Sequence, residues 1–184
     1  MARVSQVIVL VEDERQQRLI RRLLRLLRYR DHDLRFEPIP NGQGSGEAWV
    51  RERYSGAVAT YRERAARAET SLVVVIDADT EDARHRTRQL ADRLVGEGLP
   101  PCANEERIVH LVPKRNIETW ILNLNGQPVD EERDFRHAHG VDDLIDSAAQ
   151  VLFEWTRPNA EIPQHCVPSL QAAIPEIRRL EYRT

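Results

Sequence analysis

The chain has 184 residues, 41% of them hydrophobic and 31% charged, and its formal net charge is −3 at pH 7. These values exclude a disordered polypeptide and a whole-protein attraction to nucleic acid, and they predict a globular domain with a sizeable core. No stretch approaches the ~20 apolar residues of a membrane span, so no membrane association is expected. The N-terminus lacks a signal-peptide pattern and the two cysteines lack metal-binding spacing, so we expect a cytoplasmic protein.

The first part of the chain alternates between apolar strands and helices. Residues 6–12 are a continuous, largely β-branched run that predicts a buried strand, and 14–28 carry leucines at helical spacing. A second strand is predicted at 34–40, where the pattern alternates and ends in prolines. The glycine-rich stretch NGQGSG follows at 41–46, either as an ordinary connection or as a backbone cradle for phosphate. A charged helix is predicted at about 47–68.

The middle of the chain repeats the same alternation. SLVVVIDADTED, at 71–82, is a second apolar run that ends in acids, and a helix is predicted from there to about residue 95. A short strand is predicted at 107–113, with His110 as a hydrogen-bonded core residue, and a helix at 116–124. This alternation predicts the α/β class, with a sheet of about four mostly parallel strands and helices on both of its faces.

The last part of the chain has a different pattern. After a polar break, only helices are predicted, near 141–155 and 167–181. We therefore divide the chain into an α/β core at 1–125 and a helical extension at 126–184 that packs on this core.

Three acidic residues follow the two most apolar strands. Glu12 comes directly after the first run, and Asp77 and Asp79 follow the second. In a parallel α/β sheet, functional groups collect beyond the carboxyl ends of the strands, so these carboxylates are expected to converge. Converging carboxylates repel one another unless a cation neutralises them, and Mg²⁺ or Mn²⁺ prefers such oxygen ligands. The alternative for the aspartates is a helix cap that compensates the helix dipole.

An apolar strand ending in acids is typical of two unrelated magnesium sites. One is the receiver domain, in which Glu12 and Asp13 would hold the ion, Asp77 would accept a phosphoryl group, and Lys114, the single lysine, would follow the last strand. The match to this pattern is poor. Asp13 and Asp77 are too far apart in the sequence, ADTED replaces the usual apolar-Pro-Gly loop, and the lysine follows a proline instead of preceding one.

The other is the TOPRIM site, which needs a Glu at the end of the first strand and a DxD motif after a later one. Glu12 and Asp77-Ala-Asp79 match it. Over residues 6–122 the chain resembles TOPRIM proteins, namely the overcoming-lysogenisation-defect nucleases and their small stand-alone relatives. VPKRNIETW is similar to a later Glu-containing segment of those relatives. Asp13 and Gln16 depart from the family pattern, which has a Gly and a second acid at these positions. This departure weakens the prediction of a second metal site.

The resemblance implies metal-dependent hydrolysis of phosphodiester bonds in DNA or RNA. Glu12, Asp77 and Asp79 would be ligands of Mg²⁺ or Mn²⁺, and Glu118 would be a further ligand or a base that positions water. Lys114 would stabilise the phosphate or the leaving oxygen. The resemblance also implies a defence effector that works with an ATPase partner, and a homodimer is the expected assembly.

Two other functions stay open at this point. One is a divergent receiver-like signalling domain phosphorylated on Asp77. The other is a catalytically inactive TOPRIM module that binds a partner, which the Gln16 departure favours.

Overall fold

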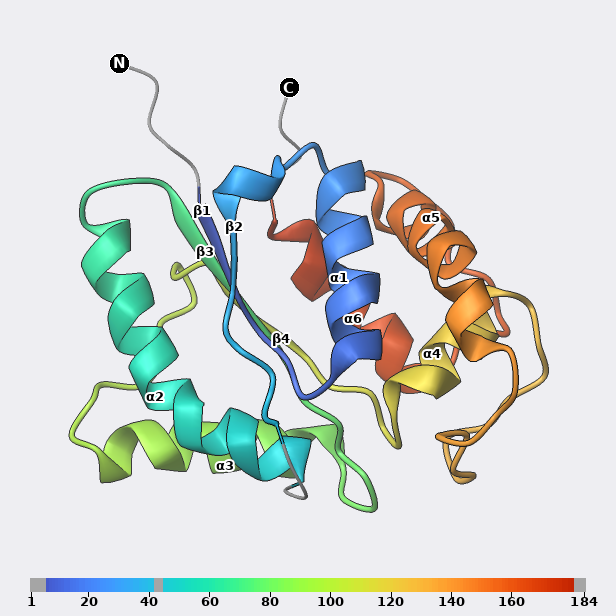
Figure 1. Cartoon of the computed structure of the whole chain (residues 1–184), viewed down its shortest axis with the longest axis horizontal. Helices are drawn as coiled ribbons and strands as arrows, with labels where there is room; N and C mark the ends of the chain where they lie inside the picture. The colour runs from blue at the N-terminus through green and yellow to red at the C-terminus, as the bar shows by residue number, and fades with distance from the viewer. Residues whose placement is uncertain (1–5, 42–44, 181–184) are drawn as a thin grey trace.

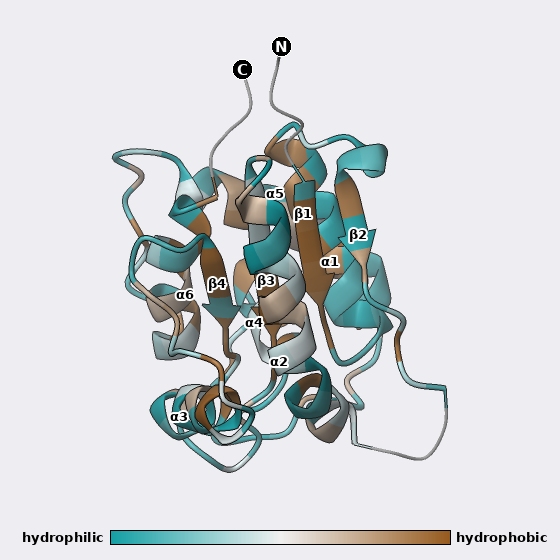
Figure 2. Cartoon of the chain, turned by 90° about the vertical axis from the view of Figure 1, so that its left-hand side faces the viewer, coloured by the Kyte–Doolittle hydropathy of each residue, from teal (hydrophilic) through white to brown (hydrophobic). Residues whose placement is uncertain are grey.

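The fold is built on a parallel β-sheet, as the computed structural model of the chain shows for residues 6–41 and 45–180. All strand pairs are parallel, and Figure 2 shows the apolar strands side by side in the order β2-β1-β3-β4. The strands are β1 (Gln6–Leu10), β2 (Leu34–Phe36), β3 (Thr70–Val75) and β4 (Ile108–Leu111). This Rossmann-like arrangement confirms the predicted α/β class and its parallel sheet of four strands.

Helices cover both faces of the sheet, also as predicted. The α-helices are α1 (Glu14–Leu26), α2 (Gly46–Ala65), α3 (Ala83–Gly96), α4 (Ile117–Leu124), α5 (Ile145–Thr156) and α6 (Pro168–Arg178). Figure 1 shows α2 and α3 on one side of the sheet and α1, α4, α5 and α6 on the other. Two short 3-10 helices, Asp31–Asp33 and Val141–Leu144, complete the described elements.

The central strands are mostly apolar because both of their faces are buried. Side chains alternate along a strand, so Val7 and Val9 of β1 enter the cluster beneath α1, whereas Ile8 and Leu10 enter the cluster beneath α2. All six residues of β3 are buried for the same reason. The continuous apolar runs in the sequence therefore reflect a sheet that is enclosed between two helical layers.

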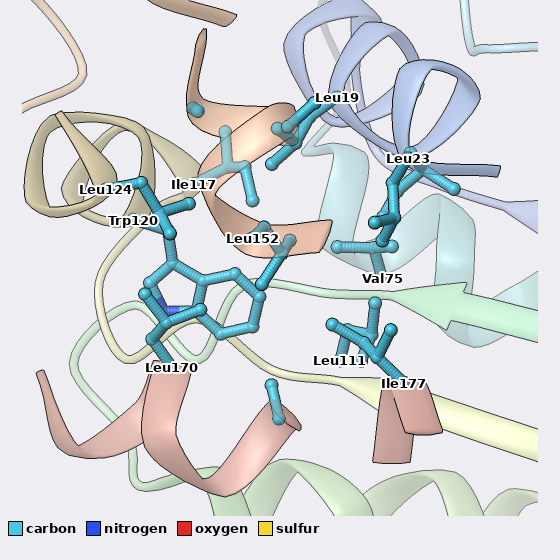
Figure 3. Close-up of a cluster of buried hydrophobic side chains, with 14 of the residues drawn as sticks. Leu19, Leu23, Val75, Leu111, Ile117, Trp120, Leu124, Leu152, Leu170 and Ile177 are labelled. Atoms are coloured by element: carbon cyan, nitrogen blue, oxygen red, sulfur yellow. The ribbon is translucent and has the colours of Figure 1, made fainter. Parts of the chain in front are cut away.

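The C-terminal helices belong to the core on the α1 side. Figure 3 shows Trp120 of α4 among apolar side chains that include Leu152 of α5 and Leu170 of α6. The indole N–H of Trp120 donates to the hydroxyl of Ser169 at 2.7 Å, which satisfies the one polar atom of that side chain. A second hydrogen bond joins α4 to the start of α6: the side-chain oxygen of Asn123 accepts from the backbone N–H of Val167 at 3.1 Å.

Some boundaries differ from the predicted ones. The second strand ends at Phe36 instead of residue 40, because Pro38 and Pro40 have no N–H to donate to a neighbouring strand. The helix predicted at 141–155 begins as a 3-10 turn and becomes α-helical only at Ile145. The predicted end of the last helix, residue 181, lies outside the described residues.

His110 lies inside β4 and has a hydrogen-bonding partner, as expected. Its Nε2 atom is 2.8 Å from the hydroxyl of Tyr54 on α2. Burial lowers the pKa of His110 to about 4, so the imidazole is neutral at physiological pH.

None of the helices in the described ranges is both long enough and apolar enough to cross a membrane.

Candidate functional site

The site forms where the two central strands end. β1 and β3 are neighbours, and the chain leaves them toward opposite faces of the sheet, which makes their carboxyl ends a topological switch point. Glu12 lies just beyond β1, and Asp77 lies just beyond β3. The backbone N–H of Asp77 donates to Oε1 of Glu12 at 2.5 Å. The convergence predicted for these two positions is therefore present.

A buried glutamine connects the two acidic residues. Asp13 caps α1, with its side chain accepting from the backbone N–H of Gln16 at 2.9 Å, and this directs the Gln16 side chain inward. The side-chain oxygen of Gln16 accepts from the backbone N–H of Glu12 at 2.9 Å. Its amide nitrogen donates to Oδ1 of Asp77 at 2.9 Å. Gln16 thus holds Glu12 and Asp77 in place.

The start of α2 closes over Glu12. A Cβ atom added at Gly46 would lie 2.7 Å from Cβ of Glu12 and 2.9 Å from its backbone oxygen, so only glycine fits at this position. Ser45 caps the helix by accepting from the backbone N–H of Ala48. Residues 42–44 of the predicted glycine-rich loop lie outside the described residues.

The two strand-end carboxyl groups are in an unfavourable environment for negative charge. Burial, with the nearby Asp13 and Asp79 carboxylates adding to it, raises the pKa of Glu12 to about 8. Burial and the adjacent Glu12 raise the pKa of Asp77 well above its usual value. Without a cation these groups therefore resist ionisation together, as expected of carboxylates that share one site.

Asp79 faces the same region but is paired with arginines. It adopts a left-handed backbone conformation with φ of 55° in the turn that follows β3. Its Oδ1 accepts from Nη2 of Arg136 at 3.0 Å, and its Oδ2 lies 3.8 Å from Nη2 of the buried Arg86. Arg86 also donates to the backbone oxygen of Asp77 at 3.1 Å, which fixes the turn. The second aspartate of the DxD motif is thus held by positive charge.

Glu118 reaches the site from the first turn of α4, which Asn116 caps. Its side chain is only 4% exposed and accepts from Nη1 of Arg15 at 2.7 Å. Burial raises the pKa of Glu118, and the bond to Arg15 opposes this shift. Arg15 also forms a two-point ion pair with Asp142, at 3.2 and 2.9 Å, so it joins α1 to both α4 and the segment before α5.

These groups line one cleft with a volume of about 760 Å³. It contains four of the five predicted site residues: Glu12, Asp77, Asp79 and Glu118. The fifth, Lys114, is absent from the lining as far as the described residues define it; its backbone N–H donates to Ser169 at 3.2 Å, and its side-chain charge lies near Asp82.

Sequence reasoning missed the basic side of the cleft. Arg15, Arg18 and Arg136 line it, and each donates to a carboxylate of the same cleft. The chain is rich in arginine, so no single arginine stood out, and Arg136 lies 57 positions from the aspartate that it contacts. The position of Arg15 in the first turn of α1, just after the acidic cluster, was the one available signal.

The carboxylates of the cleft are oxygen ligands of the type that Mg²⁺ prefers. Among the residues that the structure describes, no three His, Cys, Asp or Glu side chains are arranged to hold an ion together. Mg²⁺ is commonly bound by one or two carboxylates, with water and substrate phosphate as the other ligands. Glu12 and Asp77 provide two such carboxylates, and Asp79 faces the same cleft. The residues therefore fit a magnesium ion that is completed by substrate, and do not form a closed protein cage.

Comparisons with protein-family models, curated proteins and solved structures gave no match.

Proposed function

We propose that the chain is a Mg²⁺- or Mn²⁺-dependent nuclease of the TOPRIM type, which hydrolyses phosphodiester bonds in DNA or RNA. The observation that carries the proposal is the contact between Glu12 and Asp77, formed where two neighbouring parallel strands end in an open cleft. The Glu12 carboxyl lies close enough to the buried Asp77 carboxyl to raise its pKa, so ionising both is costly unless a cation neutralises them.

The cleft supplies both kinds of group that phosphodiester hydrolysis requires. Glu12 and Asp77 would hold the dication, and Asp79 would join them once its pairing with Arg136 is released. A bound dication would activate water and neutralise charge on the phosphate. Arginines in the same cleft provide the positive charge that a phosphate backbone needs near so many acids. In this proposal Glu118 is a further ligand or a base that positions water.

The geometry favours the nuclease over a receiver domain. A phospho-accepting aspartate must be reached by its phosphodonor, whereas Asp77 is 4% exposed and its Oδ1 is occupied by Gln16. The lysine that a receiver needs at the site would have to be Lys114, which does not contribute to the described lining of the cleft.

One observation supports a second candidate, an inactive TOPRIM module that binds a partner. Gln16 is neutral, fully buried and hydrogen-bonded to both acidic residues, so it stabilises their metal-free arrangement. In this candidate the fold is kept as a binding surface and the chain cleaves nothing, whether alone or with an ATPase partner.

Cleavage assays separate the candidates. Labelled single-stranded DNA, duplex DNA and RNA are incubated with the wild-type chain, with Mg²⁺, Mn²⁺ or EDTA. We expect divalent-dependent cleavage that Asp77→Asn abolishes and that Asp92→Asn, an exposed carboxylate on α3, leaves unchanged. Cleavage that persists in EDTA or in Asp77→Asn would refute the proposal. Activity of the isolated chain would also distinguish a free-standing nuclease from one that needs an ATPase partner.

A further inference from the structure

Arg136 is anchored at its backbone on the rim of the cleft. It lies in the segment between α4 and the 3-10 turn at Val141–Leu144. Its N–H donates to the side chain of Asp134 at 2.8 Å, and Asp134 also accepts from Asn116 at the start of α4 at 2.7 Å. Its carbonyl oxygen accepts from Nη1 of Arg15 at 3.0 Å. The guanidinium therefore extends from a fixed base, although the segment itself has no regular secondary structure.

The side chain of Arg136 crosses the rim to Asp79. The contact between Nη2 and Oδ1 is 3.0 Å, and the two side chains are 51% and 43% exposed. In the described part of the chain, Asp79 is the only side chain to which this guanidinium donates. A half-exposed pair of this kind is weak, so either member can exchange its partner for another charged group at little cost.

The other basic groups near the site are already engaged. Arg15 donates to Glu118, to Asp142 and to the carbonyl oxygen of Arg136. If its side chain turned toward a ligand, the buried Glu118 would lose its partner. Arg18 is held by the side chain and the carbonyl of Asp142. Arg18 and Arg136 can therefore turn toward a ligand without leaving a buried charge unpaired, and of these two Arg136 is the one that contacts a carboxylate of the DxD motif.

We infer that Arg136 is the residue that binds the substrate phosphate, and that Asp79 holds it in place until a dication takes that carboxylate. This inference rests on the proposed function, since it assigns a role within the same cleft. A planar guanidinium can donate two parallel hydrogen bonds to phosphate oxygens. The role that the sequence assigned to Lys114 thereby passes to an arginine from the C-terminal part of the chain.

The inference predicts effects of opposite sign on two ligands. In Arg136→Gln, Asp79 loses its competing partner, so Mn²⁺ alone should bind about two- to fivefold more tightly in a calorimetric titration. The same variant should bind a fluorescein-labelled oligonucleotide about tenfold more weakly, because a charge-assisted bond to phosphate is lost. The oligonucleotide is tested as DNA and as RNA, with Ca²⁺ in place of Mg²⁺.

Arg133→Gln is the matched control. Arg133 belongs to the same segment and carries the same charge, but it is 78% exposed and pairs only locally, with Asp130 at 3.4 Å. We expect its affinities for Mn²⁺ and for the oligonucleotide to stay within twofold of wild type, roughly the effect of an exposed charge. Circular dichroism of both variants verifies that they are folded.

The outcomes distinguish this inference from the proposed function. If Arg136→Gln binds Mn²⁺ no more tightly than wild type, or keeps wild-type affinity for the oligonucleotide, the assignment of Arg136 is wrong, whether or not the wild-type chain cleaves nucleic acid. If both shifts occur but the wild-type chain cleaves neither DNA nor RNA, the assignment stands and the nuclease proposal fails.

Discussion

Oε1 of Glu12 accepts a hydrogen bond of 2.5 Å from the backbone N–H of Asp77, across the boundary between two parallel strands. This contact brings together two residues that are 65 positions apart in the chain. It places the carboxyl group of Glu12 against the backbone of Asp77. Gln16 then hydrogen-bonds to both residues, to the backbone N–H of Glu12 and to the carboxyl group of Asp77. The chemistry that we propose depends on this pairing, and so do the predictions below.

The close approach of α2 to Glu12 gives a prediction about stability. Gly46→Ala would place its Cβ 2.7 Å from Cβ of Glu12, where backbone surrounds it, so we expect a loss of about 1–3 kcal/mol in the free energy of unfolding. Gly56→Ala is the control, because nothing lies within 4 Å of an added Cβ there. It lies inside the same helix and should be neutral or stabilise by about 0.5–1 kcal/mol. Urea unfolding measures both; equal effects would contradict the close approach.

The raised pKa of Glu12 predicts how stability depends on pH and on metal. A folded-state pKa of about 8, above the usual 4.5, means that this group's stabilising contribution is complete below about pH 4.5 and is lost as pH rises through 8. The metal-free chain should therefore lose stability toward pH 8, and Mg²⁺ should restore it there, because it binds the ionised form. Near pH 5, Mg²⁺ should have little effect.

Glu12→Gln isolates this contribution. His110 has the opposite linkage: its folded-state pKa of about 4, below the usual 6.5, makes stability fall as pH falls through this range. This effect is present in both proteins, so it cancels when the melting temperature of wild type is compared with that of Glu12→Gln. We expect the variant to show a smaller decline toward pH 8 and a weaker response to Mg²⁺, because Asp77, whose pKa is also raised, remains in place. A wild-type response to Mg²⁺ that is equal at both pH values would contradict the raised pKa.

The Arg15–Glu118 pair provides a third prediction. Arg15→Met leaves the nearly buried Glu118 without its partner, and we expect a loss of about 1–3 kcal/mol in the free energy of unfolding. The double variant Arg15→Met/Glu118→Met should recover part of this loss of stability, because no unpaired charge remains buried. Arg18→Met is the control, since Arg18 is 53% exposed and, among the described residues, its side chain donates only to Asp142. It should cost less than about 1 kcal/mol. Additive single effects in the double variant would argue against the pairing.

The parts of the site that the sequence predicts are those that depend on local pattern. A short, apolar and β-branched run is typical of a buried strand, and the acids that follow it then lie beyond the carboxyl end of that strand. Glu12 and Asp77 were therefore predictable as neighbours once the sheet was inferred to be parallel.

The parts that the sequence does not predict depend on packing between distant segments. Arg136 reaches Asp79 from an irregular segment whose path no periodicity describes, and Arg15 meets Asp142 across 127 positions. Lys114 was assigned to the site because it follows a strand end, yet β4 lies at the edge of the sheet, one strand beyond Asp77. A residue there lies beside the switch point and not within it. β2 is shorter than predicted because Pro38 and Pro40 cannot donate backbone hydrogen bonds, although residues 34–40 have the alternating pattern of a strand.

The most direct test of the account is a calorimetric titration of Mn²⁺ into wild type, Asp77→Asn and Asp92→Asn. Asn keeps the shape of the Asp77 side chain and its oxygen toward Gln16, so the fold should be retained while one of two strand-end carboxylates is removed. The account predicts that wild type and Asp92→Asn bind the ion with the same affinity and that Asp77→Asn binds it at least about tenfold more weakly. Equal binding by all three proteins, or no binding by wild type, would contradict it.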